Sequence, residues 1–158
     1  KKQNGYEYDD ISGHWAEADI LMLSDLDIGF EGGSFFPDEK ITFSDFAYLA
    51  NSLDLYSRDL SDDSFDMDEE EDAKGLTRTQ AVKYIIDAAG YKKVAAMKNI
   101  FITDFNDNNL LADEDVGYIA IARGFGFVQG DLNSFRPYDD LTRAEAVTVI
   151  LNYIRFSE

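Results

Sequence analysis

One block of sequence occurs twice in this chain. When residues 35–53 are aligned with residues 135–154, four positions coincide: Phe35 with Phe135, Pro37 with Pro137, Thr42 with Thr142, and Asp45 with Glu145. An internal repeat constrains a fold strongly, because each copy forms one supersecondary unit and buries its apolar face against its neighbours. The chain is therefore expected to consist of packed repeats.

A third copy is recognisable only in its second half. Residues 76–91 repeat the Leu-Thr-Arg of residues 141–143 and continue with Gln80 and Ala81. The front of this copy is replaced by residues 54–75, an acid-rich stretch that we predict to be a solvated loop. We expect one module, 1–158, with repeats at about 8–53, 54–98 and 103–155.

Each complete repeat is predicted to contain two helices. The second helix carries apolar residues at helical spacing, which in the last repeat are Ala146, Val147, Ile150, Leu151 and Ile154. First helices are expected at about residues 13–27 and 113–125. Three apolar second helices could pack against one another. Because long alternating runs are rare, strands should be short or absent, and the expected fold class is all-α.

The second helices begin with capping signals. A threonine stands three residues before a side chain that can reach back to it, as in a capping box, in three places: Thr142 with Glu145, Thr77 with Gln80, and Thr42 with Asp45. The last of these is the weaker version. The threonines and their partners are thus explained by helix initiation.

Capping does not explain Arg143 and Arg78, which follow two of these threonines. A cation in the first helical turn opposes the helix dipole by about 0.3 to 1 kcal/mol. One interpretation is that these side chains cover apolar neighbours or pair with Asp139, Asp140 or Asp72. The other is a small anion site, in which the guanidinium and the free N–H groups of the helix start bind one carboxylate or phosphate.

The order of motifs resembles surface-layer homology repeats. The resemblance rests on Asp10-Ile11-x-Gly13-His14-Trp15-Ala16, a glycine-containing turn, Phe-x-Pro, and the Leu-Thr-Arg-Ala-Glu of residues 141–145, in three phased copies spanning about residues 8–155. Such repeats occur in exported bacterial proteins that attach to cell-wall polysaccharide. The resemblance implies a pseudo-threefold helical module with a central three-helix bundle and grooves between the repeats.

The same resemblance assigns candidate ligand-binding residues. Arg143 and Arg78 would hold the carboxylate of a pyruvylated sugar, Trp15 would pack on a sugar face, and Gly130 would let the sugar approach the backbone. Asp10 and Asp107 would hydrogen-bond sugar hydroxyls or brace a loop.

Two departures from the family pattern limit this assignment. Phe43 stands where the family has arginine, and Leu110-Leu111-Ala112 stands where His-Trp-Ala is expected. We therefore expect fewer than three working grooves.

Charge and composition exclude several functions. A formal charge of -18 repels nucleic acid and anionic membrane surfaces, and no apolar run is long enough for a membrane span. The first residues lack the apolar core of a signal peptide, so we expect a cytoplasmic protein or a mature exported chain. With no cysteine and a single histidine, His14, neither thiol chemistry nor a histidine-based triad can be assembled, and we expect no enzyme activity.

Calcium is a weaker alternative. Asp104, Asn106, Asn108 and Asp115 have the rhythm of a calcium loop, but Asn109 stands where glycine is expected. No other cofactor is expected.

We thus predict a non-catalytic module on the bacterial cell surface that binds wall polysaccharide. An exchange of repeats between chains would make it a homo-oligomer. The alternative is a calcium-responsive or protein-interaction module that kept the fold without polymer affinity, and a hydrolase is a distant third.

Overall fold

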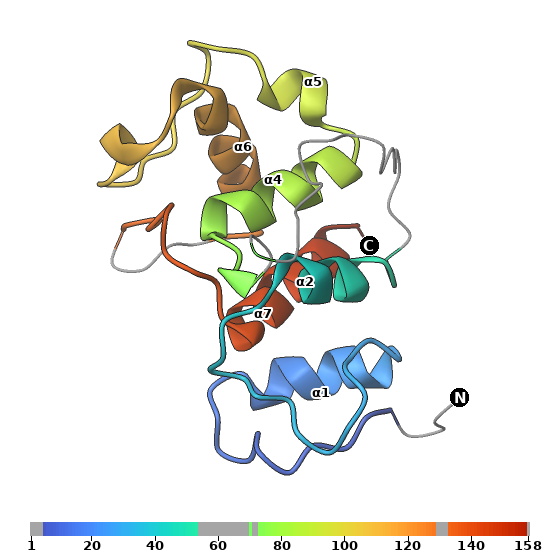
Figure 1. The fold of residues 1–158 in the computed structure, drawn as a ribbon. Helices are drawn as coiled ribbons and strands as arrows, with labels where there is room; N and C mark the ends of the chain where they lie inside the picture. The colour runs from blue at the N-terminus through green and yellow to red at the C-terminus, as the bar shows by residue number, and fades with distance from the viewer. Residues whose placement is uncertain (1–4, 54–69, 71–72, 129–132, 158) are drawn as a thin grey trace.

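The computed structural model describes residues 5–53, 70, 73–128 and 133–157, and within them the chain is helical (Figure 1). The elements are α1 (Glu17–Asp25), α2 (Phe43–Ala50), α4 (Arg78–Ala88), α5 (Lys92–Ala95), the 3-10 helix η2 (Asn108–Leu110), α6 (Asp113–Gly124) and α7 (Arg143–Ser157). The described part has no strand, only isolated bridges from Lys40 to Thr142 and from Thr77 to Asp140. The all-α prediction is confirmed.

The three second helices, α2, α4 and α7, meet in the core. Phe43 and Phe46 of α2 both place their rings edge-on to Tyr84 of α4, with centroids 5.7 Å apart. Helix α7 contacts both of the others, and its Ile150 is fully buried. These contacts arise because each helix turns its apolar stripe inward. The arrangement of three whole repeats stays a prediction, since the front of the second falls largely on residues outside the described part.

The first helices pack on the outside of this core. Helix α1 lies against α7, and α6 lies against α4, so that α1 and α5 stand at opposite ends of the molecule (Figure 1). Helix α1 begins at Glu17, later than the predicted residue 13, because Gly13 has a φ of 77° and the chain turns there before the helix starts. Helix α6 covers almost the whole predicted range.

The segments that lead into the second helices join one another by backbone hydrogen bonds. The N–H of Ile41 donates to the carbonyl of Leu141 at 2.9 Å, and the N–H of Leu141 donates to the carbonyl of Leu76 at 2.7 Å. All three side chains are buried. Equivalent residues of different copies are therefore in direct contact, and Leu141 of the third copy is bonded to both of the others.

Tyr8 fastens the N-terminal segment to the loop after α1. Its hydroxyl donates to the carbonyl of Phe30 at 3.0 Å and accepts from the N–H of Phe30 at 2.9 Å. Burial raises the pKa of Tyr8 from 10.0 to about 12. The neutral phenol is thus the form that the folded state holds.

This raised pKa predicts alkaline destabilisation. A group whose pKa is higher in the folded state contributes stability below its unfolded pKa of 10.0, and that contribution is lost as the pH rises through about 12. Urea unfolding below pH 10 and near pH 12 should show a steeper loss for the wild type than for Tyr8→Phe. Tyr138→Phe, at an exposed tyrosine, is the control: it removes the hydrogen bond to the carbonyl of Leu110 but should keep the pH dependence of the wild type. Equal pH dependence in Tyr8→Phe and the wild type would contradict the assignment.

Candidate functional site at the repeat interfaces

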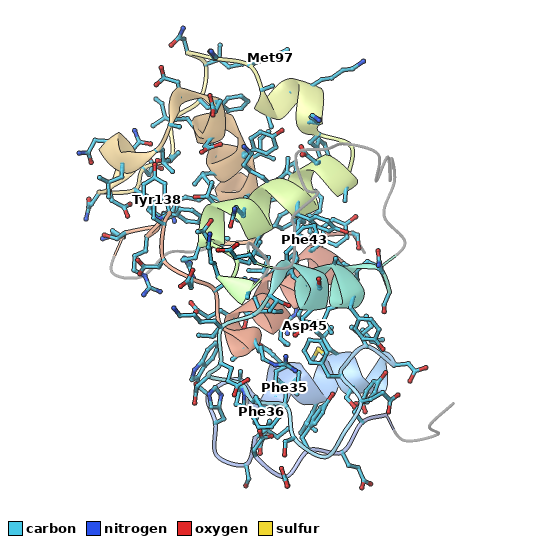
Figure 2. All side chains as sticks on the ribbon, in the orientation of Figure 1. Phe35, Phe36, Phe43, Asp45, Met97 and Tyr138 are labelled. Atoms are coloured by element: carbon cyan, nitrogen blue, oxygen red, sulfur yellow. The ribbon has the colours of Figure 1, made fainter. Side chains whose placement is uncertain are left out.

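Arg143 joins the last repeat to the first. Its Nε donates to the carbonyl of Phe35 at 2.7 Å, and its Nη1 donates to Oδ2 of Asp45 at 2.9 Å. The guanidinium carbon lies 3.8 Å from the ring centroid of Phe30, and the side chain is only 12% exposed. Figure 2 labels Phe35 and Asp45, the two residues of the first repeat that this arginine bridges.

Arg78 makes the same contacts one interface further on. Its Nε donates to the carbonyl of Phe135 at 2.8 Å, and its Nη1 donates to Oε2 of Glu145 at 2.7 Å. The guanidinium carbon lies 5.4 Å from the centroid of the Phe135 ring, and the side chain is 11% exposed. Arg78 thus links the second repeat to the third with the same two hydrogen bonds by which Arg143 links the third repeat to the first.

These contacts answer why a cation stands in the first helical turn. The sequence suggested Asp139, Asp140 or Asp72 as protein partners, of which Asp72 lies outside the described residues. Each instead binds the acid three residues past the threonine cap of the next copy, Asp45 or Glu145. The unfavourable interaction with the arginine's own helix dipole is offset by a charge-assisted hydrogen bond across the interface.

The residue equivalent to Arg78 and Arg143 in the first repeat is not an arginine. Phe43, labelled in Figure 2, replaces the arginine in the first repeat. Its ring contacts the ring of Tyr84 in α4. In the second repeat the capping partner is Gln80, a neutral residue, where the other two copies have an acid. The missing arginine of the first repeat and the missing acid of the second repeat therefore fall at the same interface, as expected if each pair acts across an interface.

The capping residues start the second helices, and Glu145 also binds an arginine of another repeat. Thr77 and Gln80 form a complete capping box. Thr142 and Glu145 exchange the same two bonds at 3.1 Å each, so Glu145 uses Oε1 for the cap and Oε2 for Arg78. Thr42 accepts from the N–H of Asp45 at 3.1 Å.

Asp10 and Asp107 each clasp a loop. The two carboxylate oxygens of Asp10 accept from the N–H groups of Phe35 and Phe36 at 2.8 and 2.7 Å. Asp107 accepts from the N–H groups of Phe135 and Arg136 at 2.9 and 2.7 Å. Both oxygens of each acid bind the protein itself, which is the loop-bracing alternative considered from the sequence.

The clasped loops have a strained backbone at the middle residue of Phe-x-Pro. Phe36 has a φ of 58° and Arg136 a φ of 59°, a left-handed conformation that residues other than glycine rarely adopt. This turn directs the carbonyls of Phe35 and Phe135 toward the arginines, and it turns residues 36 and 136 outward. The paired N–H bonds to the aspartate hold the turn in place.

The outward residues form the accessible rim of each interface. At the first interface Trp15 is 64% exposed. Beside it, Nε2 of His14 donates a 2.8 Å hydrogen bond to Oδ1 of Asp38, which lies in the same loop as Phe36, while Nδ1 accepts from the N–H of Ala16. At the second interface the rim residue is Arg136, whose side chain is 40% exposed. Arg136 was missed in the sequence, because it is the variable residue of Phe-x-Pro and no motif marks it.

Arg136 adds a second cation to the second interface. Its Nη2 lies 3.5 Å from the same Glu145 oxygen that Arg78 binds, and its Nη1 lies 3.4 Å from Asp139. Two guanidinium groups therefore share Glu145. Of the two, Arg136 is the more exposed, at 40% against 11% for Arg78.

The remaining candidate site residues are Gly130 and the four proposed calcium ligands. Gly130 lies outside the described residues. Among the calcium candidates, Asn108 accepts a hydrogen bond from Thr103 at 2.6 Å, and Asp115 pairs with Lys83 at 2.9 Å. Within the described ranges no group of three or more His, Cys, Asp or Glu could hold a metal ion. Calcium binding stays a prediction.

The fold and the interfaces define an all-α repeat protein whose copies are linked by arginine–acid pairs. In a comparison with protein families, residues 7–47 and 111–147 match the S-layer homology domain. The two matched segments are consistent with an S-layer homology protein. A comparison with curated proteins gives no match.

Domains of this family generally anchor proteins to polymers of the bacterial cell wall, which indicates a cell-surface role. In the described part of the chain, none of the helices has the length and apolar character needed to cross a membrane.

Proposed function

We propose that the chain is a non-catalytic module that anchors a protein to cell-wall polysaccharide through the rims of its repeat interfaces. The observation that carries the proposal is the pair of equivalent interfaces, each of which presents an exposed side chain beside a largely buried arginine. The largely buried arginines fix the loops, and the exposed residues are the ones that a polymer can reach.

The second interface suits a negatively charged sugar substituent such as a pyruvate ketal. Arg136 is accessible, and its contacts with Glu145 and Asp139 are longer than 3.3 Å, so a ligand carboxylate can form the better hydrogen bonds. Arg78, held behind it, adds positive potential without needing to move. Arg143 has no such companion, because Phe36 occupies the equivalent loop position.

The first interface suits the apolar face of a sugar ring. Trp15 and Phe36 are both large and exposed, and the bond between His14 and Asp38 ties their two segments together. The rim of the second interface would thus bind the charged substituent, and the rim of the first interface would bind the apolar face of a sugar.

Sedimentation with cell-wall sacculi tests the anchoring proposal. The wild type should pellet with intact sacculi and stay in solution when the attached polymer has been stripped by acid. Arg136→Gln should weaken binding roughly tenfold, the size of one charge-assisted hydrogen bond. Arg155→Gln removes an exposed arginine elsewhere on the surface and should bind like the wild type.

Three outcomes would contradict parts of the anchoring proposal. A wild type that fails to pellet with intact sacculi would exclude wall anchoring and favour an interaction module. Normal pelleting by Arg136→Gln would exclude the assigned anion contact. Trp15→Ala should reduce binding while the helical circular dichroism stays unchanged, and full binding by this variant would remove the aromatic contact.

A further inference from the structure

One end of the molecule carries a basic, apolar surface that the interfaces do not use. Residues 88–103 contain no acid, although the chain as a whole has a formal charge of -18. Within this stretch lie four exposed apolar residues and three lysines, here called the lysine tip: Lys92, Lys93, Val94, Met97, Lys98, Ile100 and Ile102. Ile102 is 83% exposed, the largest value among the exposed large hydrophobics of the described residues.

The lysine tip is held in a fixed position. Helix α5 lies so close to α6 that a Cβ atom on Gly117 would come within 2.0 Å of the carbonyl oxygen of Ala95. Beyond it, the chain turns at Asn99, which has a φ of 66°, and re-enters the protein at the buried Thr103. The exposed apolar side chains are therefore presented by a supported loop (Figure 2, where Met97 marks this end).

The other end carries a complementary surface on α1. Leu21, Met22 and Leu26 are exposed there, together with the acids Asp25 and Asp27 at the end of the helix. We call these five residues the α1 face. The last turn of α1 contains no basic residue, so Asp25 adds its charge to the negative end of the helix dipole.

Both surfaces carry charged side chains for which the described part of the chain supplies no ion-pair partner. Lys93 and Lys98 of the lysine tip, and Asp25 and Asp27 of the α1 face, form no ion pair with other described residues. Each surface therefore exposes apolar side chains beside unpaired charge, and the two surfaces carry opposite signs.

We propose that the lysine tip of one copy docks on the α1 face of a second copy. Lysines would neutralise the acidic helix end, and the apolar residues of both surfaces would be removed from water. The charge of -18 repels a second copy as well as an anionic membrane. A second copy, however, offers exposed apolar side chains beside acids, so the local match between the two surfaces favours this occupant.

The position of the two surfaces determines the kind of assembly. They lie at opposite ends of the molecule, with α5 at the top and α1 at the bottom of Figure 1. A contact between different surfaces is heterologous, and it produces open rows of molecules unless the rotation between neighbours closes a ring. This inference does not depend on wall binding.

Reciprocal charge reversals test the proposal. Lys98→Glu places like charges at the contact between two copies, and so does Asp25→Lys, so each variant alone should associate at least tenfold more weakly than the wild type. Mixed in equal amounts, the two variants should regain association, because every contact then pairs opposite charges. Sedimentation velocity at physiological salt, up to millimolar protein, measures all three samples.

The controls separate this geometry from others. Lys74→Glu makes the same charge change at an exposed lysine outside the lysine tip and should associate like the wild type. A wild type that stays monomeric throughout, or a mixture that fails to regain association, would overturn the proposal. Wild-type-like association of Asp25→Lys alone would indicate tip-to-tip contact and would also overturn it, as would preferential binding of the lysine tip to phosphatidylglycerol vesicles.

Discussion

Arg143→Met is expected to lower the free energy of unfolding by roughly 2 to 3 kcal/mol. The substitution keeps an apolar side chain on the Phe30 ring but removes both hydrogen bonds, leaving the carbonyl of Phe35 and the carboxylate of Asp45 without this donor. For a chain of this length the loss corresponds to a decrease in melting temperature of roughly 5 to 10 °C. Thermal unfolding followed by circular dichroism measures it.

A double-mutant cycle isolates the pair itself. Asp45→Asn keeps the size of the side chain and the N–H bond to Thr42, so it removes little besides the charge. The coupling between Arg143→Met and Asp45→Asn should be near 1 kcal/mol, since the carboxylate is partly exposed. Arg155→Met, on the same helix but exposed, should cost less than about 0.5 kcal/mol. Equal effects at residues 143 and 155 would refute a role for Arg143 in joining the repeats.

Local signals predicted the helices, because capping and periodicity depend on residues close in sequence. Thr77 and Gln80 form the box that their spacing indicates, and Gly90 has the positive φ expected of a helix end. The delayed start of α1 and the short α5 were not predicted. The first depends on a turn at Gly13, and the second has only four residues, too few for a periodic pattern.

The partners of the arginines could not be predicted in the same way. Arg78 and Glu145 are 67 residues apart, and Arg143 and Asp45 are 98 apart, so their pairing depends on how whole repeats pack. The repeat alignment contained one signal of this pairing. One copy lacks the arginine, with Phe43 in its place, and another lacks the acid, with Gln80 in its place. The outward position of Arg136 depends on a left-handed φ that a Phe-x-Pro motif does not reveal.

Asp107→Ala should cost roughly 3 kcal/mol at neutral pH. Two N–H groups lose a charged acceptor, and one of them belongs to Arg136, whose strained backbone the acid holds. Asp10→Ala removes the equivalent clasp in the first repeat and should also destabilise the protein. Asp139→Ala, an exposed acid in the same loop, is the control and should change the unfolding midpoint little.

The effect of Asp107 should also depend on pH. Partial burial raises the pKa of this carboxyl, but the hydrogen bonds from Phe135 and Arg136 outweigh burial and lower it below 3.8. A lowered pKa in the folded state contributes stability above pH 3.8 that is lost as the pH falls through the folded value. Urea unfolding should therefore show a gap between the wild type and Asp107→Ala that is full at pH 7 and narrows in acid. A gap of constant size would mean that the loop is held by the shape of the side chain, because protonation would then leave its contribution unchanged.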